Sequence, residues 1–401
     1  MHAPGPRPPS PGPAEVAADV AAGVAADVAA DVAADVAAGS PAGPESPFDA
    51  YGLPGRPGTD AFWAAATPAY VPSGDGGWVA LFRWRGGPAV VEFESWSDPV
   101  PLVRWRSTEC WYAEVRMPAR LRVTYRFRTD DGSYADPYNP AGAGGERSVT
   151  ATPDAPPQPH WPAVDADDVL PLPRARLRWA SARLGGRRTV RVHPVGGGGP
   201  AVLLLDGDDW LHLHPAMTAF DTAFAAGEMP PATLVFVPAK DRLAEFGCRP
   251  EWWEAVRDEL LPLLAEAEVP VDAGKLVVVG QSLGGLSAMY AALEFPELVN
   301  RVACQSPSFW WAPGAENLPD PLGGPVGGAI AARLRERPAP AGLRIAFDLG
   351  EHETRMRPHC ELVEALTERA GASVRISRSA AGHDRAGWRQ ALLRDVAWAL
   401  G

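Results

Sequence analysis

A single serine stands where a catalytic nucleophile is expected. The apolar run 276–279 ends at Gly280, Ser282 follows one residue later, and Gly284 and Gly285 open a stretch whose apolar side chains have helical spacing. A strand, a Gly-x-Ser-x-Gly turn and a helix make a nucleophile elbow, in which only glycine is expected to fit two residues to either side of the strained serine. Gly280 and Gly284 occupy those positions, and we expect Gly285 to let the helix pack closely against the sheet. The pattern predicts nucleophilic catalysis by Ser282, the alternative being an ordinary Gly-Ser turn.

A serine hydroxyl needs a base within hydrogen-bond reach, and three histidines follow Ser282 in the sequence. His383 lies in a Gly-His-Asp sequence after the last predicted strand and before the last predicted helix, which is where the elbow topology places its base. His352 and His359 fall instead at the start of a helical segment. We therefore predict His383 as the base, and we expect the adjacent Asp384 to point elsewhere.

The carboxylate that orients the base should lie on the loop after the strand 343–349. That loop contains Glu351 and Glu353, and Asp348 ends the strand itself. We choose Glu353 as the acid. Asp348, Glu351 and a dyad without an acid remain as alternatives.

Two backbone N–H groups must stabilise the oxyanion that forms when a serine attacks a carbonyl. One is expected from Leu283, the residue after the nucleophile. The other is expected from the loop that follows the third strand of the catalytic domain, residues 205–210. Gly207 permits an unusual turn in this loop, and Asp208 is our candidate for the second N–H.

The elements around these residues alternate between strands and helices. Such alternation predicts a mostly parallel sheet covered by helices on both faces, and an α/β-hydrolase has this order, with its serine after the fifth strand. The predicted strands are 175–183, 187–193, 201–206, 232–238, 275–280, 301–305, 343–349 and 373–378, and the predicted helices include 251–266, 283–294, 329–336, 358–370 and 387–400.

The chain before this domain has a different character. Residues 1–46 are rich in proline and then repeat valine every four residues, a period that lines no single helix face, so we predict a disordered low-complexity tail. Residues 47–140 contain short aromatic and β-branched runs that alternate with period two, which predicts a small all-β, Ig-like sandwich domain. Residues 141–172 are rich in glycine and proline and are predicted to be a linker, which leaves 173–401 as the catalytic domain.

Composition limits the possible partners. The chain has 401 residues, is 46% hydrophobic and carries a formal net charge of −12, so it lacks the basic surface that a nucleic-acid partner requires. The four cysteines are far apart and form no C-x-x-C pair, so we expect neither a zinc site nor a disulfide framework, and no metal is assigned. No apolar run reaches the length of a membrane helix and no secretory signal is evident. We expect a cytoplasmic protein that is a monomer or a weak oligomer.

Taken together, the motifs resemble those of the enterochelin (enterobactin) esterase family of ferric-siderophore hydrolases. The resemblance runs from the β-rich region to the C-terminus. The segments that carry it are 135–140 (ADPYNP), 155–161 (APPQPHW), 181–184 (SARL) with Arg187 and Arg188, 205–207 (LDG) with Trp210, 280–288 (GQSLGGLSA), 305–311 (QSPSFWW), and 382–384 (GHD) with Trp388 and Arg389.

The resemblance implies an α/β-hydrolase with a preceding β-domain, with Ser282 and His383 catalytic and Glu353 as the acid. It implies hydrolysis of the ester bonds of a catecholate siderophore, without a cofactor, since iron enters with the substrate. A ferric tris-catecholate is a bulky trianion, so its site should combine arginines with flat aromatic walls. The candidate substrate-binding residues are Arg242, Arg249, Trp210, Trp310, Trp311, Arg83 and Arg85, the last two reaching over from the β-domain.

Some positions depart from the family pattern, and two other functions compete. The segment 241–245 follows the family loosely, Pro307 replaces a smaller residue, and Asp208 with Asp209 adds negative charge near the pocket. An esterase or acyltransferase of the same fold, acting on a feruloyl or mycolyl-type ester, is one alternative. A siderophore-binding protein without catalysis is the other, and the intact Ser282 and His383 disfavour it.

Overall fold

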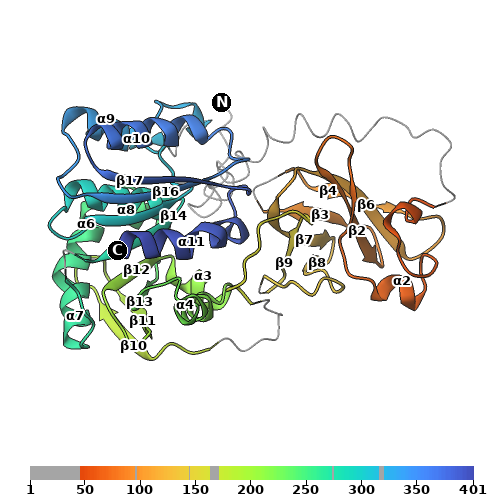
Figure 1. Cartoon of the computed structure of the whole chain (residues 1–401), viewed down its shortest axis with the longest axis horizontal. Coiled ribbons are helices and arrows are strands. Elements are labelled where there is room, and N and C mark those ends of the chain that lie inside the picture. Colours follow the sequence, from red (N-terminus) through yellow and green to blue (C-terminus); the bar gives the residue numbers. More distant parts are fainter. Residues whose placement is uncertain (1–45, 95–96, 144, 163–170, 273–274, 316–319) are drawn as a thin grey trace, which may run out of the picture.

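The computed structural model describes residues 46–94, 97–143, 145–162, 171–272, 275–315 and 320–401. Apart from Ser46, the predicted low-complexity tail lies outside the described residues. The described chain forms a β-rich part and an α/β part side by side, joined by one connecting segment (Figure 1). We call them the β-domain (residues 46–151), the linker (152–174) and the α/β-domain (175–401).

The β-domain is built from two antiparallel sheets that share one core. Phe82 and Val115 of one sheet pack with Val91, Tyr125 and Phe127 of the other in a single apolar cluster. Period-two burial along the strands produces this arrangement, because alternate side chains point to the same face. One sheet has the order β1 (Ala69–Pro72), β2 (Trp78–Arg85), β6 (Cys110–Met117), β5 (Val103–Arg104), and the other has the order β4 (Val100–Pro101), β3 (Val90–Phe93), β7 (Arg122–Thr129), β8 (Gly132–Tyr134).

Two short helical segments and one further strand complete the β-domain. Phe48, the residue before the 3-10 turn η1 (Asp49–Tyr51), packs with Phe62 and Trp63 of the helix α2 (Asp60–Ala64) in a second apolar cluster against β2. The strand β9 (Ser148–Ala151) pairs with β7. This strand falls within the segment 141–172 that was predicted to be a linker, so the first part of that segment extends a sheet of the β-domain.

The α/β-domain contains one sheet of eight strands. Its order is β10-β11-β13-β12-β14-β15-β16-β17, antiparallel at β10–β11 and β11–β13 and parallel in every other pairing. The eight predicted strands and the mostly parallel sheet are therefore confirmed, and the elbow serine follows the fifth strand of the domain. The strands are β10 (Ala175–Ala180), β11 (Arg187–Val195), β12 (Ala201–Leu205), β13 (Ala232–Val237), β14 (Val277–Gln281), β15 (Arg301–Gln305), β16 (Arg344–Gly350) and β17 (Ser373–Ser379).

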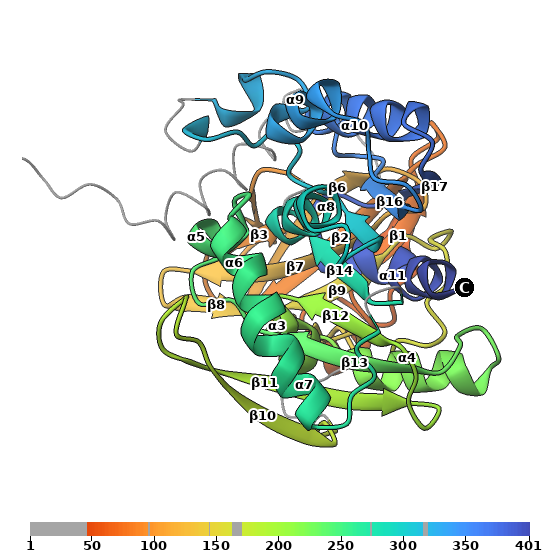
Figure 2. The same ribbon diagram turned by 90° about the vertical axis from the view of Figure 1, so that its left-hand side faces the viewer.

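Helices cover both faces of this sheet, and Figure 2 shows α6 and α7 along one side with α4 and α11 along the other. The central strands are apolar throughout because both of their faces are buried. Leu203 and Val278 face one core, whereas Leu204 and Val279 face the other. The helices are α3 (Gly207–His212), α4 (Ala216–Ala225), α5 (Arg242–Phe246), α6 (Pro250–Ala255), the π-helical turn η2 (Val256–Leu260), α7 (Leu261–Glu266), α8 (Leu283–Glu294), η4 (Pro321–Gly323), α9 (Gly328–Glu336), α10 (Arg357–Arg369) and α11 (Arg385–Leu400).

The topology places the predicted catalytic residues at one edge of the sheet. Ser282, Glu353 and His383 follow β14, β16 and β17, which are parallel. The loop with Asp208 follows β12, which is parallel to β14. Because the carboxyl ends of parallel strands meet at the same edge, these loops converge, as ligand-binding loops do in open α/β sheets.

Candidate active site

Ser282 occupies a strained turn between β14 and α8. Its backbone has φ 55° and ψ −121°, a conformation that residues other than glycine rarely adopt. A Cβ on Gly280 would lie 2.1 Å from the carbonyl oxygen of Gly284, so glycine is required there. A Cβ on Gly285 would lie 3.0 Å from Pro307 Cβ, which agrees with the predicted close packing of α8.

One part of the elbow prediction is wrong. A Cβ on Gly284 would meet Asp206 Oδ2 and Leu205 Cβ at 3.5 Å, an ordinary van der Waals distance. The steric requirement for glycine therefore falls on Gly280 and not on Gly284. The reason is that the nearest atoms to Gly284 belong to the side chains of Leu205 and Asp206, at the end of β12. The nearest atoms to Gly280 belong to the backbone at the start of α8.

The buried end of β14 fixes the residue before the nucleophile. Gln281 donates from Nε2 to Gln305 Oε1 over 2.9 Å and accepts from Trp210 Nε1 over 3.0 Å. The N–H of Ser282 donates to the Gln305 carbonyl over 3.0 Å. The Ser282 hydroxyl is 3.2 Å from Ser308 Oγ, and the Ser308 N–H donates to the Ser282 carbonyl over 3.0 Å. The elbow is therefore bonded to the loop that follows β15.

His383 is paired with the predicted acid. Its Nδ1 lies 2.7 Å from Glu353 Oε2, which leaves Nε2 as the nitrogen available to a substrate or nucleophile. The His383 ring packs edge-to-face with Trp388, with centroids 5.1 Å apart and an interplanar angle of 83°. The ring is thus oriented by a carboxylate on one side and an indole on another.

Glu353 is itself buried and hydrogen-bonded. The residue is 2% exposed, and its Oε1 accepts from the Gly350 N–H over 2.9 Å and from the Ser306 hydroxyl. Ser306 accepts in turn from Trp388 Nε1 over 2.8 Å. Sequence reasoning assigned no role to Ser306 or Trp388, although both lie in motifs that carried the resemblance.

The alternative acids are placed differently. Asp348 is buried, and its carboxylate accepts hydrogen bonds of 2.8 Å from the hydroxyls of Ser377 and Ser379. Burial raises the pKa of this carboxyl above its ordinary value. Glu351 is half-buried, and its N–H donates to the Ser379 carbonyl. The geometry therefore favours Glu353 as the partner of His383.

The two candidate oxyanion donors are both at helix starts. Leu283 is the first residue of α8 and Asp208 lies in the first turn of α3, where backbone N–H groups have no partner within the helix. The Asp208 carboxylate is exposed and paired with Arg191. The left-handed residue of this loop is Asp206, with φ 54°, whereas Gly207 serves a close approach, since a Cβ there would lie 2.5 Å from Val237 N.

The arginines predicted to bind the substrate, Arg249 apart, are paired with other groups of the protein in the described structure. Arg83 is buried and donates to the carbonyls of Phe62, Ala65 and Ala66, and Arg85 is exposed and paired with Glu109 at 3.1 Å. Arg242 forms a bidentate pair with Asp206, with distances of 2.7 and 2.8 Å.

The predicted tryptophans lie in the core. Trp210 is fully buried and bonded to Gln281, and Trp310 and Trp311 are 6% and 4% exposed within the larger core cluster. Arg249 is exposed, at the start of α6. Arg85 is exposed as well, and the Arg242 side chain, paired with Asp206 on the loop after β12, is 40% exposed.

Two buried cysteines contact the backbone close to Ser282 and in the loop after β15. Cys304 Sγ donates to the Gly285 carbonyl over 3.4 Å, and Cys360 Sγ to the Pro307 carbonyl over 3.6 Å. Burial raises the pKa of both thiols well above the ordinary value. Because a cysteine is nucleophilic only as its thiolate, the raised pKa values disfavour a nucleophilic role for these two thiols.

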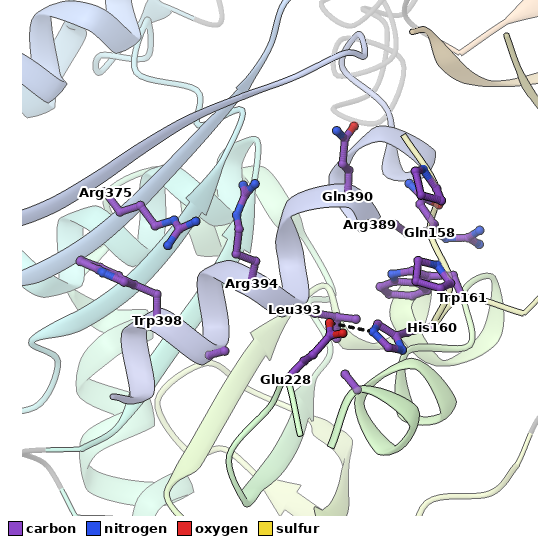
Figure 3. A pocket seen from close by; sticks show the side chains of 14 residues that line it. Gln158, His160, Trp161, Glu228, Arg375, Arg389, Gln390, Leu393, Arg394 and Trp398 are labelled. Carbon is purple, nitrogen blue, oxygen red and sulfur yellow. Dashed lines mark hydrogen bonds and ion pairs between the residues drawn. The ribbon is translucent and has the colours of Figure 1, made fainter. Parts of the chain in front are cut away.

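A pocket of about 480 Å³ lies away from these loops, between the linker and α11 (Figure 3). Gln158, His160 and Trp161 of the linker line one part of it, with Arg389 and Trp398 of α11 among the other lining residues. His160 is 3.0 Å from Glu228, and the Arg389 guanidinium lies 5.2 Å from the centre of the Trp161 ring. None of Ser282, Glu353 and His383 lines this pocket, so we do not assign it to the reaction.

Comparison with known proteins identifies the family. The esterase family model, described as "Putative esterase", matches residues 181–399. The iron(III) enterobactin esterase of Dickeya dadantii is 31% identical over 374 residues, which cover 82% of this chain and 86% of that protein. The chain belongs to the enterobactin esterase family. The iron(III) enterobactin esterase of Escherichia coli K12, another relative, is 31% identical over 350 residues, covering 78% of this chain and 85% of that protein.

Solved structures of enterobactin esterases share this architecture. The ferric enterobactin esterase of Salmonella typhimurium aligns with a TM-score of 0.74 at 27% identity, covering 85% of this chain and 98% of that one. The Shigella flexneri enterobactin esterase, solved in the presence of enterobactin, aligns with a TM-score of 0.74 at 26% identity and the same coverage. Membership of the enterobactin esterase family makes this chain a carboxylic-ester hydrolase.

Two further observations are confined to the residues that the structure describes. No helix among them is both long and apolar enough to cross a membrane. Within the same ranges, no three or more His, Cys, Asp or Glu side chains are grouped as a metal site requires.

Proposed function

We propose that this chain is a siderophore esterase, which hydrolyses the ester bonds of a ferric catecholate siderophore through Ser282, His383 and Glu353. The observation that carries the proposal is the 2.7 Å pairing of His383 with Glu353 at the sheet edge where the strained Ser282 turn also lies, in a chain of this family. The relatives are named as enterobactin esterases, and two thirds or more of their length is matched.

In the proposed acylation step, Ser282 Oγ attacks the ester carbonyl carbon while His383 Nε2 accepts the serine proton. The carbonyl oxygen becomes an oxyanion, for which the N–H groups of Leu283 and Asp208 are the proposed donors. Glu353 stabilises the imidazolium through Nδ1. As the tetrahedral intermediate collapses, the C–O bond to the leaving alcohol breaks and His383 returns the proton to that oxygen.

Deacylation repeats the sequence with water. His383 Nε2 accepts a proton from a water molecule, whose oxygen attacks the acyl carbon of the Ser282 ester. The second intermediate releases the carboxylic acid, and His383 protonates the departing Ser282 Oγ. Both half-reactions balance without an added oxidant, reductant or cofactor, and the iron is part of the substrate.

A cytoplasmic location fits this proposal. The four cysteines are all free, and reduced thiols are typical of a reducing compartment. We propose that the cleaved siderophore releases its iron there, and that the enzyme acts as a monomer or a weak oligomer on a small-molecule substrate.

The experiment is a chromatographic time course of the purified protein with ferric enterobactin, iron-free enterobactin and a p-nitrophenyl ester, with Ser282→Ala as the blank. We expect stepwise release of linear trimer, dimer and monomer, reduced by several orders of magnitude in the Ser282→Ala variant. Equal turnover in that variant would refute the mechanism.

Two other results would redirect the assignment. Cleavage of the simple ester alone would retain the triad and move the substrate to another acyl class, such as a feruloyl or mycolyl-type ester. Binding of enterobactin without cleavage of any ester would favour a non-catalytic siderophore-binding protein.

A further inference from the structure

The loop that carries His383 is bonded from two domains. Within the α/β-domain, the Ala381 carbonyl accepts from the His352 N–H over 3.1 Å. From the β-domain, the Arg122 N–H donates to the Ala380 carbonyl over 3.4 Å, and Thr124 bonds to Asp384. The helix α11, which follows this loop, begins at the side of the α/β-domain that faces the β-domain (Figure 1).

Asp384 joins the two domains through a single carboxylate. Its Oδ1 accepts from the Thr124 hydroxyl over 2.9 Å and from the Ala386 N–H over 2.9 Å, the second being the N-cap bond of α11. Its Oδ2 accepts from the Thr124 N–H. Asp384 and Thr124 are 1% and 2% exposed, so water does not replace these bonds readily.

Further contacts hold the start of α11 in the same place. Arg385 pairs with Asp209 of the α/β-domain and lies 3.9 Å from Glu94 of the β-domain. Gln158 of the linker donates from Nε2 to the Ala386 carbonyl over 2.7 Å, and Figure 3 shows Gln158 beside α11. Asp384, the residue after His383, therefore lies within the contact between the domains.

Asp384 is covalently linked to His383, the proposed catalytic base, so its position affects the position of the imidazole. The two residues share a peptide bond, and the Asp384 N–H donates to the Gly382 carbonyl over 2.9 Å, which closes a tight turn around His383. A displacement of a catalytic group by about 1 Å can cost about 100-fold in rate. Any change in how Asp384 docks is therefore expected to reach the imidazole.

We propose that Asp384 is a positioning residue and that Thr124 of the β-domain, acting through Asp384, holds His383 in its working orientation. The β-domain is then part of the apparatus that sets the catalytic base. This inference rests on the proposed role of His383, and it adds a contribution from the β-domain to the contacts with Glu353 and Trp388 that orient the ring from within the α/β-domain.

Three substitutions test the hydrogen bonds between Thr124 and Asp384 while changing little else around them. Thr124→Val removes the hydroxyl and keeps the shape of the side chain, whereas Thr124→Ser keeps the hydroxyl. Asp384→Asn retains an oxygen for the α11 cap, where asparagine is well suited, and turns an NH2 group toward the Thr124 N–H.

Thr67→Val is the matched control. The Thr67 hydroxyl donates to Asp136 over 2.7 Å, and both residues are buried in the β-domain, as Thr124 is. This bond lies within the β-domain and does not reach the His383 loop. It therefore reproduces the loss of a buried threonine-to-aspartate hydrogen bond without the contact between domains.

The experiment measures kcat and KM for p-nitrophenyl acetate, and the rate of labelling by a fluorophosphonate probe, in the full-length variants. We expect Thr124→Val to lower kcat about tenfold and Asp384→Asn about 10- to 100-fold, with KM unchanged and the labelling rates lowered in parallel. Thr124→Ser and Thr67→Val should keep wild-type kcat, even where Thr67→Val lowers the melting temperature.

Neither probe requires a siderophore, so failure to cleave enterobactin would sink the proposed function and leave this test intact. Wild-type kcat in both Thr124→Val and Asp384→Asn, measured per folded protein by circular dichroism, would overturn the positioning role. An equal loss of kcat in Thr67→Val and Thr124→Val would also overturn it, because the effect would then be one of general stability.

Discussion

Trp388 donates its indole N–H to Ser306 over 2.8 Å, and the Ser306 hydroxyl donates to the oxygen of Glu353 that does not contact His383. The Glu353 carboxylate is therefore held through both oxygens, one of them paired with His383 and the other bonded to Ser306 and Gly350. Hydrogen bonds to the second oxygen of a carboxylate commonly fix its orientation when the first oxygen contacts a functional group.

Ser306→Ala should lower kcat about tenfold and leave KM unchanged, because Glu353 loses a buried donor and gains freedom to rotate. The Trp388 N–H also loses its acceptor, which we expect to cost about 1–3 kcal/mol of unfolding free energy. Steady-state kinetics on a p-nitrophenyl ester and thermal melts check both effects. Trp388→Phe, which keeps a ring against His383, should lose less activity, and an unaffected kcat in Ser306→Ala would argue against this role.

Glu353→Gln and Asp348→Asn together distinguish the acid from its main alternative. Replacing the carboxylate that contacts His383 Nδ1 should lower kcat by about 10³- to 10⁴-fold, as in other serine triads. Asp348→Asn should keep kcat within a few-fold and lower the melting temperature, since one acceptor of the Ser377 and Ser379 hydroxyls is replaced by a donor. A large kcat loss in Asp348→Asn with little loss in Glu353→Gln would reverse the assignment.

The glycines of the elbow should respond differently to alanine. Gly280→Ala places a methyl group 2.1 Å from backbone, so we expect loss of activity and a large drop in melting temperature. Gly284→Ala meets only ordinary contacts and removes a glycine from α8, which should stabilise the helix by about 0.5–1 kcal/mol. Esterase assays and melts on the two variants measure this, and equal damage in both would contradict the steric account.

Asp395 should make stability depend on pH. Burial, and then repulsion from Asp348, raises the pKa of its carboxyl to about 7, against partial compensation by Arg394 and Arg375. Because the folded state binds this proton more tightly than the unfolded state, the contribution of Asp395 to stability falls as the pH rises from about 4 to about 7.

Asp395→Asn removes that titration. We expect the melting temperature of the variant, relative to wild type, to rise by several degrees between pH 5 and pH 8. Asp130→Asn, at an exposed turn between β7 and β8, is the control and should show a constant difference. A constant difference in Asp395→Asn as well would show that the carboxyl does not titrate in this range.

Much of the α/β-domain could be predicted because its central strands β12, β13 and β14 are mostly continuous apolar runs. The apolar run that forms β14 predicts both a buried strand and the position of Ser282. A strand buried on both faces is apolar at every position, so its sequence pattern is easy to recognise. His383 followed from chain order, because the loop after the last parallel strand must reach the same edge. Glu353 was chosen from one short loop, and its contact with His383 agrees with that choice.

Other features depend on contacts that are distant in sequence. Thr124 and Asp384 are separated by 260 positions and Ser306 and Trp388 by 82, so nothing local to either residue signals the pair. The role of an arginine or a tryptophan is equally hidden. Arg83 has a side chain suited to binding an anion, yet it lies in the core of the β-domain, where three backbone carbonyls accept its hydrogen bonds.

The two thiols behind the catalytic loops have a consequence for oxidative damage. Cysteine oxidation follows thiolate character and exposure, and Cys304 and Cys360 have neither, being buried with raised pKa values. A ferric siderophore, the proposed substrate, would bring iron, which promotes oxidation, close to these loops. With Cys304 and Cys360 protonated and out of contact with solvent, the loops after β14 and β15 have sulfur neighbours that resist conversion to sulfenic acid.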